Sequence, residues 1–300
     1  MAAEWIDLVD PSRDDIARVL DTPLPDGAME LLTTPARDGH AAVPILEGHG
    51  GCVLAVLARP VAARGKDRPD YLELDVLATP AKVVTVRKSG PGGVLPPVDG
   101  VAAQADAGAP AGRVFQAAID DCADAFLELL DELYESIDDL EDEIDRLTGA
   151  DVRRRITTLR NELLHARRAS SATRGIARRI VDGRVDVGRS ELFPPELENR
   201  FVDTYESLVR VTEELDVARD LLGGVRDFYQ AKIAEQQNEV AKTLTVIAAL
   251  VLVPSFIVGF YGQNFGGHFR DWYWSIGVSV GLIVATTAVQ LVLFRRRRWI

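Results

Sequence analysis

The stretch LTVIAALVLVPSFIVGFY, residues 244–261, runs for eighteen residues without a charged side chain. A helix rises about 1.5 Å per residue, so this stretch reaches nearly across a hydrocarbon layer about 30 Å thick. A second uncharged stretch, WYWSIGVSVGLIVATTAVQLVLF, fills residues 272–294. Two such runs in succession exceed the usual pattern of buried helices in a soluble core. The sequence therefore predicts two C-terminal transmembrane spans, at 244–261 and 272–294.

Basic residues predict the orientation of these spans. Lys242 precedes the first span and the run Arg295–Arg298 directly follows the second, whereas the intervening loop, 262–271, has one basic residue, Arg270. Basic residues flank spans on the cytoplasmic side. We therefore expect both termini in the cytoplasm, with Arg295, Arg296, Arg297 and Arg298 in the tail 295–300 acting as an electrostatic anchor. The Arg- and Ala-rich composition favours a bacterial source, and hence the inner membrane.

The composition also excludes some functions. With 34 basic and 46 acidic residues the formal charge is −12, which argues against nucleic-acid binding and suits cations better. The two cysteines, Cys52 and Cys122, have no metal-ligand spacing. The four histidines are scattered and no nucleophile lies at a fixed spacing from a base, so the sequence does not predict an enzyme.

Residues 1–112 are expected to form a cytoplasmic α/β domain. Short apolar or alternating runs bounded by Gly, Pro or charges predict strands at WIDLV, GGCVLAVLARPV, DYLELDVLAT and AKVVTVRK. Ser12 is predicted to cap a helix. The segment VAAQADAGAPAG, 101–112, is predicted to be a linker because small residues, Gly and Pro dominate it.

Residues 113–193 are expected to form a helical hairpin with opposite charges facing. Thirteen acidic residues and no Lys or Arg lie between Asp120 and Asp145, beside an apolar stripe at helical spacing. Thr148 and Gly149 are predicted to end this helix, and an arginine-rich helix follows from Asp151. The acidic surface is either an ordinary solvated face or a surface that attracts cations.

A long stalk helix is predicted over 194–243, with Pro194 or Pro195 in its first turn. Apolar residues then alternate at spacings of four and three, which is the pattern of a heptad seam. The seam consists of Leu197, Phe201, Thr204, Leu208, Val211, Leu215, Ala218, Leu222, Val225 and Tyr229. We expect this helix to continue into the first span.

The same count started at Asp227 follows a second face that is small or polar almost throughout. It passes Asp227, Ala231, Ala234, Asn238, Ala241, Thr245, Ala248, Leu252, Ser255 and Gly259 and ends at Gly262. Small residues in a span permit close helix packing. Alternatively, several such helices surround a water-filled path, which requires a homo-oligomer with cyclic symmetry.

The motif YGQNF, residues 261–265, follows that face at the outer end of the first span. Gly262, Gln263 and Asn264 offer backbone carbonyls and two amides, which are oxygen ligands without charge. Mg²⁺ dehydrates reluctantly, and neutral amides can hydrogen-bond its water shell. Turn chemistry explains the three residues equally well.

In this context the sequence resembles the CorA magnesium-transporter family, whose signature Tyr-Gly-Met-Asn-Phe ends the first of two C-terminal spans. This chain has YGQNF, preceded by NEVAKTLTVIAALVLVPSFIVGF and followed at the terminus by RRRRWI. The resemblance implies a funnel-shaped homopentamer with an α+β cytoplasmic domain, long stalk helices and two spans, the first lining a pore. Gln263 in place of Met, and an outer loop with His268, Arg270 and a single acid, Asp271, depart from the family pattern.

The resemblance also implies roles for individual residues. Gly262 and Asn264 would form the outer selectivity ring, and Asn238 a polar ring near the inner mouth. The residues that would line or constrict the pore are Ala241, Leu244, Leu252, Ser255 and Gly259. Asp227 resembles the stalk half of a regulatory Mg²⁺ site between subunits, for which Asp70, Asp75 and Asp99 are candidate partners.

The predicted function is passive Mg²⁺ and Co²⁺ influx gated by cytosolic Mg²⁺, with Mg²⁺ both transported and regulatory and no organic cofactor. The expected partners are further copies of the chain, membrane lipid and divalent cations, not nucleic acid. One alternative is a Zn²⁺ transporter of the same superfamily, with or without proton coupling. A second is a membrane-anchored coiled-coil receptor that transports nothing.

Overall fold

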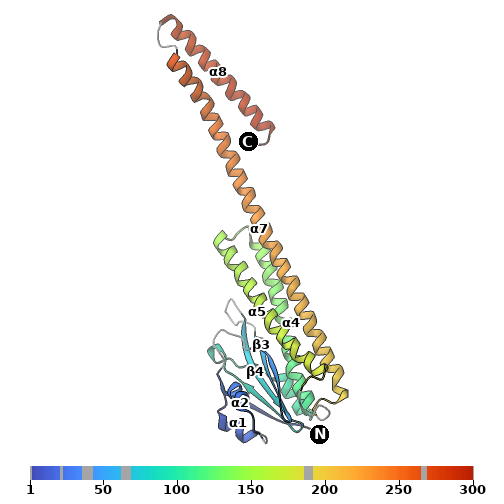
Figure 1. Cartoon of the computed structure of the whole chain (residues 1–300). Helices are drawn as coiled ribbons and strands as arrows, with labels where there is room; N and C mark the ends of the chain where they lie inside the picture. Colours follow the sequence, from blue (N-terminus) through green and yellow to red (C-terminus); the bar gives the residue numbers. More distant parts are fainter. Residues whose placement is uncertain are drawn as a thin grey trace. The chain divides into compact units, whose positions relative to one another are not determined.

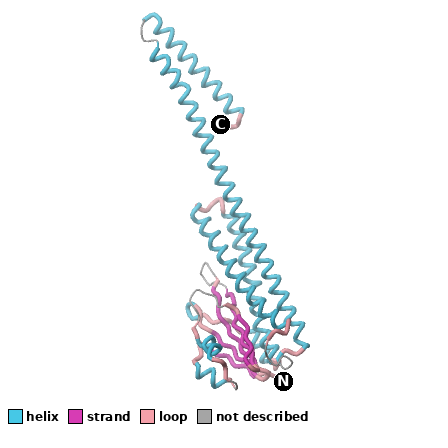
Figure 2. Tube along the Cα trace, viewed as in Figure 1, coloured by secondary structure: helices cyan, strands magenta, loops and turns pink. Residues whose placement is uncertain are grey.

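The computed structural model describes residues 2–20, 23–35, 43–61, 69–185, 192–264 and 269–299. The chain divides into two compact units, Met1–Val225 and Arg226–Ile300. Figure 1 and Figure 2 show strands and helices in the first unit and helices alone in the second.

A five-stranded sheet forms the base of the first unit. Its strands are β1 (Glu4–Val9), β2 (Ile45–His49), β3 (Cys52–Val61), β4 (Asp70–Ala78) and β5 (Lys82–Arg87). The spatial order is β1-β5-β4-β3-β2, in which β1 and β5 are parallel and the other neighbours antiparallel. All four predicted strands are confirmed, and β2 is an additional one.

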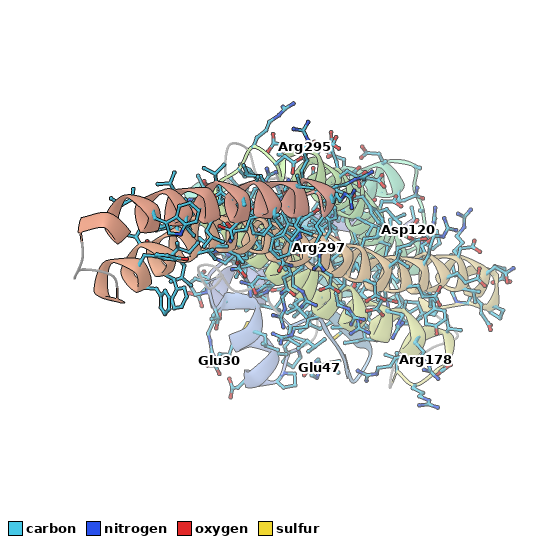
Figure 3. The ribbon with its side chains drawn as sticks, turned by 90° about the horizontal axis from the view of Figure 1, so that it is seen from above. Glu30, Glu47, Asp120, Arg178, Arg295 and Arg297 are labelled. Atoms are coloured by element: carbon cyan, nitrogen blue, oxygen red, sulfur yellow. The ribbon has the colours of Figure 1, made fainter. Side chains whose placement is uncertain are left out.

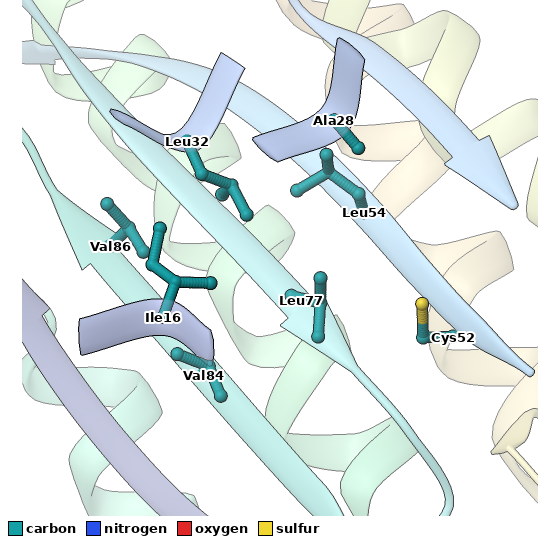
Figure 4. Close-up of a cluster of buried hydrophobic side chains, with 8 residues drawn as sticks. All are labelled: Ile16, Ala28, Leu32, Cys52, Leu54, Leu77, Val84 and Val86. Atoms are coloured by element: carbon teal, nitrogen blue, oxygen red, sulfur yellow. The ribbon is translucent and has the colours of Figure 1, made fainter. Parts of the chain in front are cut away.

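Helices cover the sheet on both faces. The short helices α1 (Arg13–Val19) and α2 (Asp26–Thr33) pack on one face, where Ile16 and Leu32 meet Leu54, Leu77 and Val86 (Figure 4). The long helices α4 (Ala111–Glu143) and α5 (Gly149–Val181) contact β3 on the other. Because β3 is covered on both faces, its residues 52–58, CVLAVLA, form a continuous apolar run without alternation.

Ser12 caps α1 as predicted. Its Oγ accepts a hydrogen bond from the Asp15 backbone N–H at 3.3 Å, and the Asp15 carboxylate accepts one from the Ser12 N–H at 3.0 Å. This reciprocal pair is a capping box, which satisfies two backbone donors that the helix start leaves free.

The predicted linker at 101–112 is wrong. Helix α3 (Asp99–Asp106) occupies its first half, with Val101 fully buried, and α4 begins at Ala111. Alanine is the best helix former, and it outweighs the Gly and Pro residues near the segment's end.

The boundary between α4 and α5 also differs from the prediction. Helix α4 ends at Glu143, and Thr148 is the N-cap of α5, where its side chain accepts a hydrogen bond from the Asp151 N–H. Thr148 and Gly149 thus start a helix instead of ending one, in keeping with the preference of Thr for N-caps.

The hairpin itself forms as predicted, but its arginines serve two partners. Arg155 pairs with Glu143 of α4 at 2.5 Å. Arg167 instead pairs with Asp216 of α7 at 2.9 Å, and Arg174 donates to the Thr212 hydroxyl of α7. Charge therefore ties α5 to the following helix as well as to α4.

Helix α7 (Pro195–Asn264) begins at one of the two predicted prolines and contributes to both units. In the first unit its predicted seam is confirmed, because every seam position from Leu197 to Val225 is buried. Phe201 additionally makes an edge-to-face contact with Phe193, which in turn lies against Phe115 of α4.

The second unit consists of the later part of α7 and helix α8 (Phe269–Arg296). Each of these helices contains a stretch that is long and apolar enough to cross a membrane, and almost none of either stretch is buried. Leu252 is 71% exposed and Trp274 is 77% exposed. Large apolar side chains at such exposure are unlike the core helices of a soluble protein.

Candidate functional site

The small, uncharged face of α7 is exposed along its length in the second unit. The exposed residues are Asn238, Ala241, Thr245, Ala248, Leu252, Ser255, Gly259 and Gly262. Leu244, which the family resemblance places on this face in preference to Thr245, is 61% exposed. The structure therefore leaves the whole candidate face open to solvent, lipid or another copy.

Helix α8 packs on a different side of α7. Gln290 of α8 donates its Nε2 hydrogen to the Ala249 carbonyl of α7 at 3.2 Å. Between residues 241 and 262 the shielded residues of α7 are Val246, Ala249, Leu250, Val253, Pro254, Ile257 and Tyr261. At about 100° per residue this shielded side lies roughly opposite the candidate face. The chain's own second span therefore does not cover that face.

Hydroxyl groups on the candidate face keep their oxygens available. Thr245 Oγ1 donates to the Ala241 carbonyl at 2.8 Å, and Ser255 Oγ donates to the Val251 carbonyl at 2.7 Å. Each hydroxyl hydrogen is thereby used within the helix, while the oxygen lone pairs point away from the bonded carbonyl. Such oxygens can accept hydrogen bonds from the water shell of a cation.

Pro254 lies inside α7, one residue from Ser255. A proline has no N–H, so the carbonyl four residues earlier, on Leu250, loses its usual partner. In a span, such a freed carbonyl is tolerated where water or a neighbouring helix can reach it. Pro254 and the two hydroxyl residues give this half of α7 more polar character than its composition alone indicates.

The structure describes the backbone of the YGQNF motif as far as Asn264. Helix α7 continues through Gly262 to Asn264, three residues beyond the predicted end of the span at Tyr261. The side chains of Gln263 and Asn264, and the loop residues Phe265–His268, lie outside the described residues. The backbone therefore places Gly262, Gln263 and Asn264 in the last turn of the helix.

Asp227, the predicted regulatory residue, is exposed on α7. Arg226 is its ion-pair partner, with Arg226 Nη2 and Asp227 Oδ1 3.0 Å apart. Among the described residues of one chain, no three His, Cys, Asp or Glu side chains converge as a metal site would require.

The candidate partners of Asp227 differ in accessibility. Asp75 is fully buried under α2 and lies 3.1 Å from Lys88 Nζ, so it is not available to a neighbouring subunit. Asp99 is exposed at the start of α3, and Asp70 is half-buried at the start of β4. Burial thus removes one of the three candidates.

The basic tail ends α8 in a folded turn. Arg295, Arg296, Arg297 and Arg298 are all exposed, and Figure 3 labels Arg295 and Arg297. The rings of Phe294 and Trp299 stack with their centroids 5.9 Å apart. Sequence reasoning missed this pair, for which the signal was two aromatics flanking the arginine run.

These features define the class: a protein with an α/β unit, a long helix and two C-terminal helices of the membrane-spanning type. The family model described as CorA-like Mg²⁺ transporter protein matches residues 2–296, so the chain belongs to this family.

Two solved structures and one curated relative show the same likeness. The chain is 26% identical over 188 residues to the cobalt/magnesium transport protein CorA of Thermotoga maritima, covering 61% of this chain and 51% of that protein. The chain thus spans about half the length of that relative. The complete structure of the CorA magnesium transporter from Methanocaldococcus jannaschii aligns with 99% of this chain and 91% of its own, with a TM-score of 0.74 and 16% identity. The structure of the full-length CmaX protein aligns with 98% of this chain and 88% of its own, with a TM-score of 0.68 and 23% identity.

Proposed function

We propose that this chain forms a homopentameric channel that carries Mg²⁺, and also Co²⁺, passively into the bacterial cytoplasm across the inner membrane. The observation that carries the proposal is the uncovered, uncharged face of α7 from Asn238 to Gly262, opposite the side on which α8 packs. One chain cannot enclose a path, so several copies must turn this face toward a common axis. Five is the number that the family resemblance implies.

The proposed path has no fixed charge along the span. Asn238 stands at the inner mouth, Gly262, Gln263 and Asn264 stand at the outer mouth, and Leu244 and Leu252 form the constrictions. The remaining lining residues are Ala241, Thr245, Ser255 and Gly259. Neutral oxygens bind a hydrated divalent ion less tightly than carboxylates, so entry and release both stay fast.

The membrane potential supplies the driving force. A divalent cation that crosses about 100 mV gains about 4.6 kcal/mol, equivalent to about three decades in concentration ratio. Influx therefore requires no ATP. With both termini in the cytoplasm, the Arg295–Arg298 tail stands on the negative side of the membrane, which the distribution of basic residues favours.

Regulation is proposed to act through Asp227. Cytosolic Mg²⁺ would bridge Asp227 of one subunit to a carboxylate of its neighbour and hold the stalk helices together. When the Mg²⁺ concentration falls, the carboxylates repel and the constrictions open. Asp227→Ala should weaken the inhibition of flux by internal Mg²⁺. Glu235→Ala, which removes an exposed acid of α7 outside the candidate face, should not.

Flux through purified protein tests the proposal. The full chain is reconstituted in liposomes that contain a Mg²⁺-sensitive dye, and a K⁺ diffusion potential, negative inside, is applied. We expect potential-driven influx that falls at least about tenfold in Asn264→Ala, since a lost binding interaction of about 1.4 kcal/mol is worth that factor. Asn161→Ala, an exposed asparagine of α5, is the matched control. A dimer or trimer without flux would favour the receptor alternative.

A Zn²⁺ transporter is the second candidate because the outer loop contains His268 and only one acid, Asp271. Imidazole is a common zinc ligand. Competition of Zn²⁺ and Co²⁺ against Mg²⁺ in the same liposomes separates the two. If Zn²⁺ permeates in preference to Mg²⁺, and an imposed pH gradient drives it, the second candidate is correct.

A further inference from the structure

The C-terminus of α8 is a folded cap, not a frayed end. The Trp299 N–H donates to the Phe294 carbonyl at 2.9 Å, and the Arg298 N–H donates to the Arg295 carbonyl at 3.2 Å. Arg298 adopts φ +53°. These two bonds around one left-handed residue are the Schellman motif, in which the chain reverses at the helix end.

Glycine usually occupies the left-handed position of this motif, because a Cβ atom disfavours it. Here an arginine occupies it, and the stacked rings of Phe294 and Trp299, inclined by 9°, hold the reversed chain in place. Arg298 therefore adds a fourth guanidinium group to the cap, at a left-handed position that glycine would adopt at lower cost. It also holds the Trp299 indole beside the last apolar turn of α8.

The four guanidinium groups of this cap are open to a ligand. Arg295, Arg296, Arg297 and Arg298 are exposed. Within the described ranges, none of the four forms an ion pair with a carboxylate of the same chain. The cap bonds also occupy the carbonyls of Phe294 and Arg295, which reduces the negative character that a bare helix end would present to an anion.

We propose that this cap binds the phosphate groups of anionic phospholipids in the cytoplasmic leaflet. The guanidinium fork matches phosphate oxygens in pairs, and juxtamembrane arginine clusters are attracted to the negative surface of that leaflet. Trp299 belongs at headgroup depth, where indole rings are favoured. A soluble polyanion would meet the repulsion of a chain with formal charge −12. The inference uses the proposed placement of α8 across a membrane but not the transport of any ion.

Lipid binding to the full chain in neutral detergent tests the inference. Native mass spectrometry compares dioctanoyl phosphatidylglycerol with dioctanoyl phosphatidylcholine. The tail variant is R295Q/R296Q/R297Q/R298Q. The matched control, R153Q/R154Q/R160Q/R168Q, removes four exposed arginines of α5. Detergent removes membrane topology from the comparison, and the readout does not depend on flux.

We expect phosphatidylglycerol to bind at least about tenfold more tightly than phosphatidylcholine, since each arginine near an anionic surface contributes about fivefold. The preference should disappear in the tail variant, persist in the α5 control and weaken in high salt. Trp299→Ala keeps all four charges but should lose about threefold. Equal binding of the two lipids, or a preference that survives in the tail variant, would overturn the proposal. Displacement of the lipid by an equal concentration of glycerol phosphate would do so too, because the site would then take free phosphate.

Discussion

At the scale of single residues, the first unit contains a buried charged cluster between its sheet and α2. Asp75 is fully buried on β4, and Lys88 Nζ lies 3.1 Å from its Oδ2. Lys88 also bonds Glu73 and donates to the Leu31 carbonyl at 2.6 Å. Burial raises the pKa of Asp75 to about 7, and the Lys88 ammonium opposes that shift. Below about pH 7 the Asp75 carboxyl is therefore protonated in the folded state, whereas in the unfolded chain it ionises above about pH 4.

The proton on Asp75 predicts a pH-dependent stability. Between pH 4 and pH 7 the folded state holds one proton more than the unfolded chain, whose Asp has a pKa near 3.9. Stability should thus fall as pH rises from about 4 and level off above the folded pKa of about 7, so that about 1.4 kcal/mol is lost between pH 6 and pH 8. Thermal unfolding of the full chain, followed by circular dichroism, measures the change. Asp75→Asn should flatten the profile, and an unchanged slope in that variant would contradict the assignment.

Gly112, in the first turn of α4, marks a close approach of two segments. A Cβ atom there would lie 1.9 Å from the Leu192 carbonyl oxygen, which belongs to the backbone and cannot swing away. Gly112→Ala should therefore destabilise the first unit by about 1–3 kcal/mol, the usual cost of overpacking. Gly175→Ala is the control, because nothing lies within 4 Å of its added Cβ in α5. That change should stabilise by about 0.5–1 kcal/mol, so chemical denaturation of both variants should give opposite signs.

At the scale of elements, one polar residue interrupts the seam between α4 and α7. Thr204 is fully buried, accepts a hydrogen bond from Gln116 Nε2 at 2.7 Å, and lies 2.6 Å from Asp120 Oδ1. Helices with uniformly apolar seams can slide by a heptad, and a buried polar pair that is satisfied in one alignment opposes this. Thr204 therefore fixes the register of α7 on α4.

Replacing Thr204 with valine keeps the shape and removes the hydroxyl. Gln116 and Asp120 then lose a partner inside the seam, which should cost about 1–3 kcal/mol of unfolding free energy. Thr157→Val, at an exposed hydroxyl of α5 that bonds the Arg153 carbonyl, should cost much less. Urea unfolding of the two variants provides the comparison. Equal losses would mean that the Thr204 network does not hold the two helices together.

The sequence predicted those elements in which the spacing of apolar residues matches the side that is buried in the structure. The α7 seam was visible because one side of the helix is buried from Leu197 to Val225. Helix α3 was missed because its alanines lie near Gly108 and Pro110, which resemble a linker locally. Thr148 was assigned to the wrong helix because a helix stop and the next N-cap use similar residues.

Some features of the candidate site could likewise be predicted from the sequence, and others could not. The small, uncharged face of α7 was visible in the sequence because small residues recur at spacings of four and three, and its role as a path for ions stays a prediction. The burial of Asp75 does not, because the alternation in DYLELDVLA predicts a solvated polar side, whereas α1 and α2 cover that side of the sheet. The cap at Trp299 depends on the left-handed backbone of Arg298, a conformation for which an arginine gives no sequence signal.

At the scale of the whole molecule, a single repeat runs along α7. Continued from Val225 at spacings of four and three, the buried seam of the first unit reaches Val246, Leu250, Val253 and Ile257. These four are among the shielded residues of α7 in the second unit, whereas Gln236, Glu239 and Thr243, which the walk passes on the way, are exposed. The heptad positions that are buried in the first unit are thus shielded again between Val246 and Ile257. In the second unit the small, uncharged face from Asn238 to Gly262 stays exposed, and this is the face that the proposed homo-oligomer would turn toward its axis.

A bulky side chain on the open face should therefore stop flux without unfolding the chain. Ala248 is exposed on that face, and in the proposed homo-oligomer Ala248→Phe would place one ring per subunit on the shared axis. We expect influx in the liposome assay to fall to the level of empty liposomes, with the oligomer size in detergent unchanged. Val284→Phe adds similar bulk at a residue of α8 that is 63% exposed and that we place toward lipid, so its flux should stay within about twofold of the original, as for surface substitutions generally. Normal flux in Ala248→Phe, or equal loss in both variants, would show that ions do not pass along this face of α7.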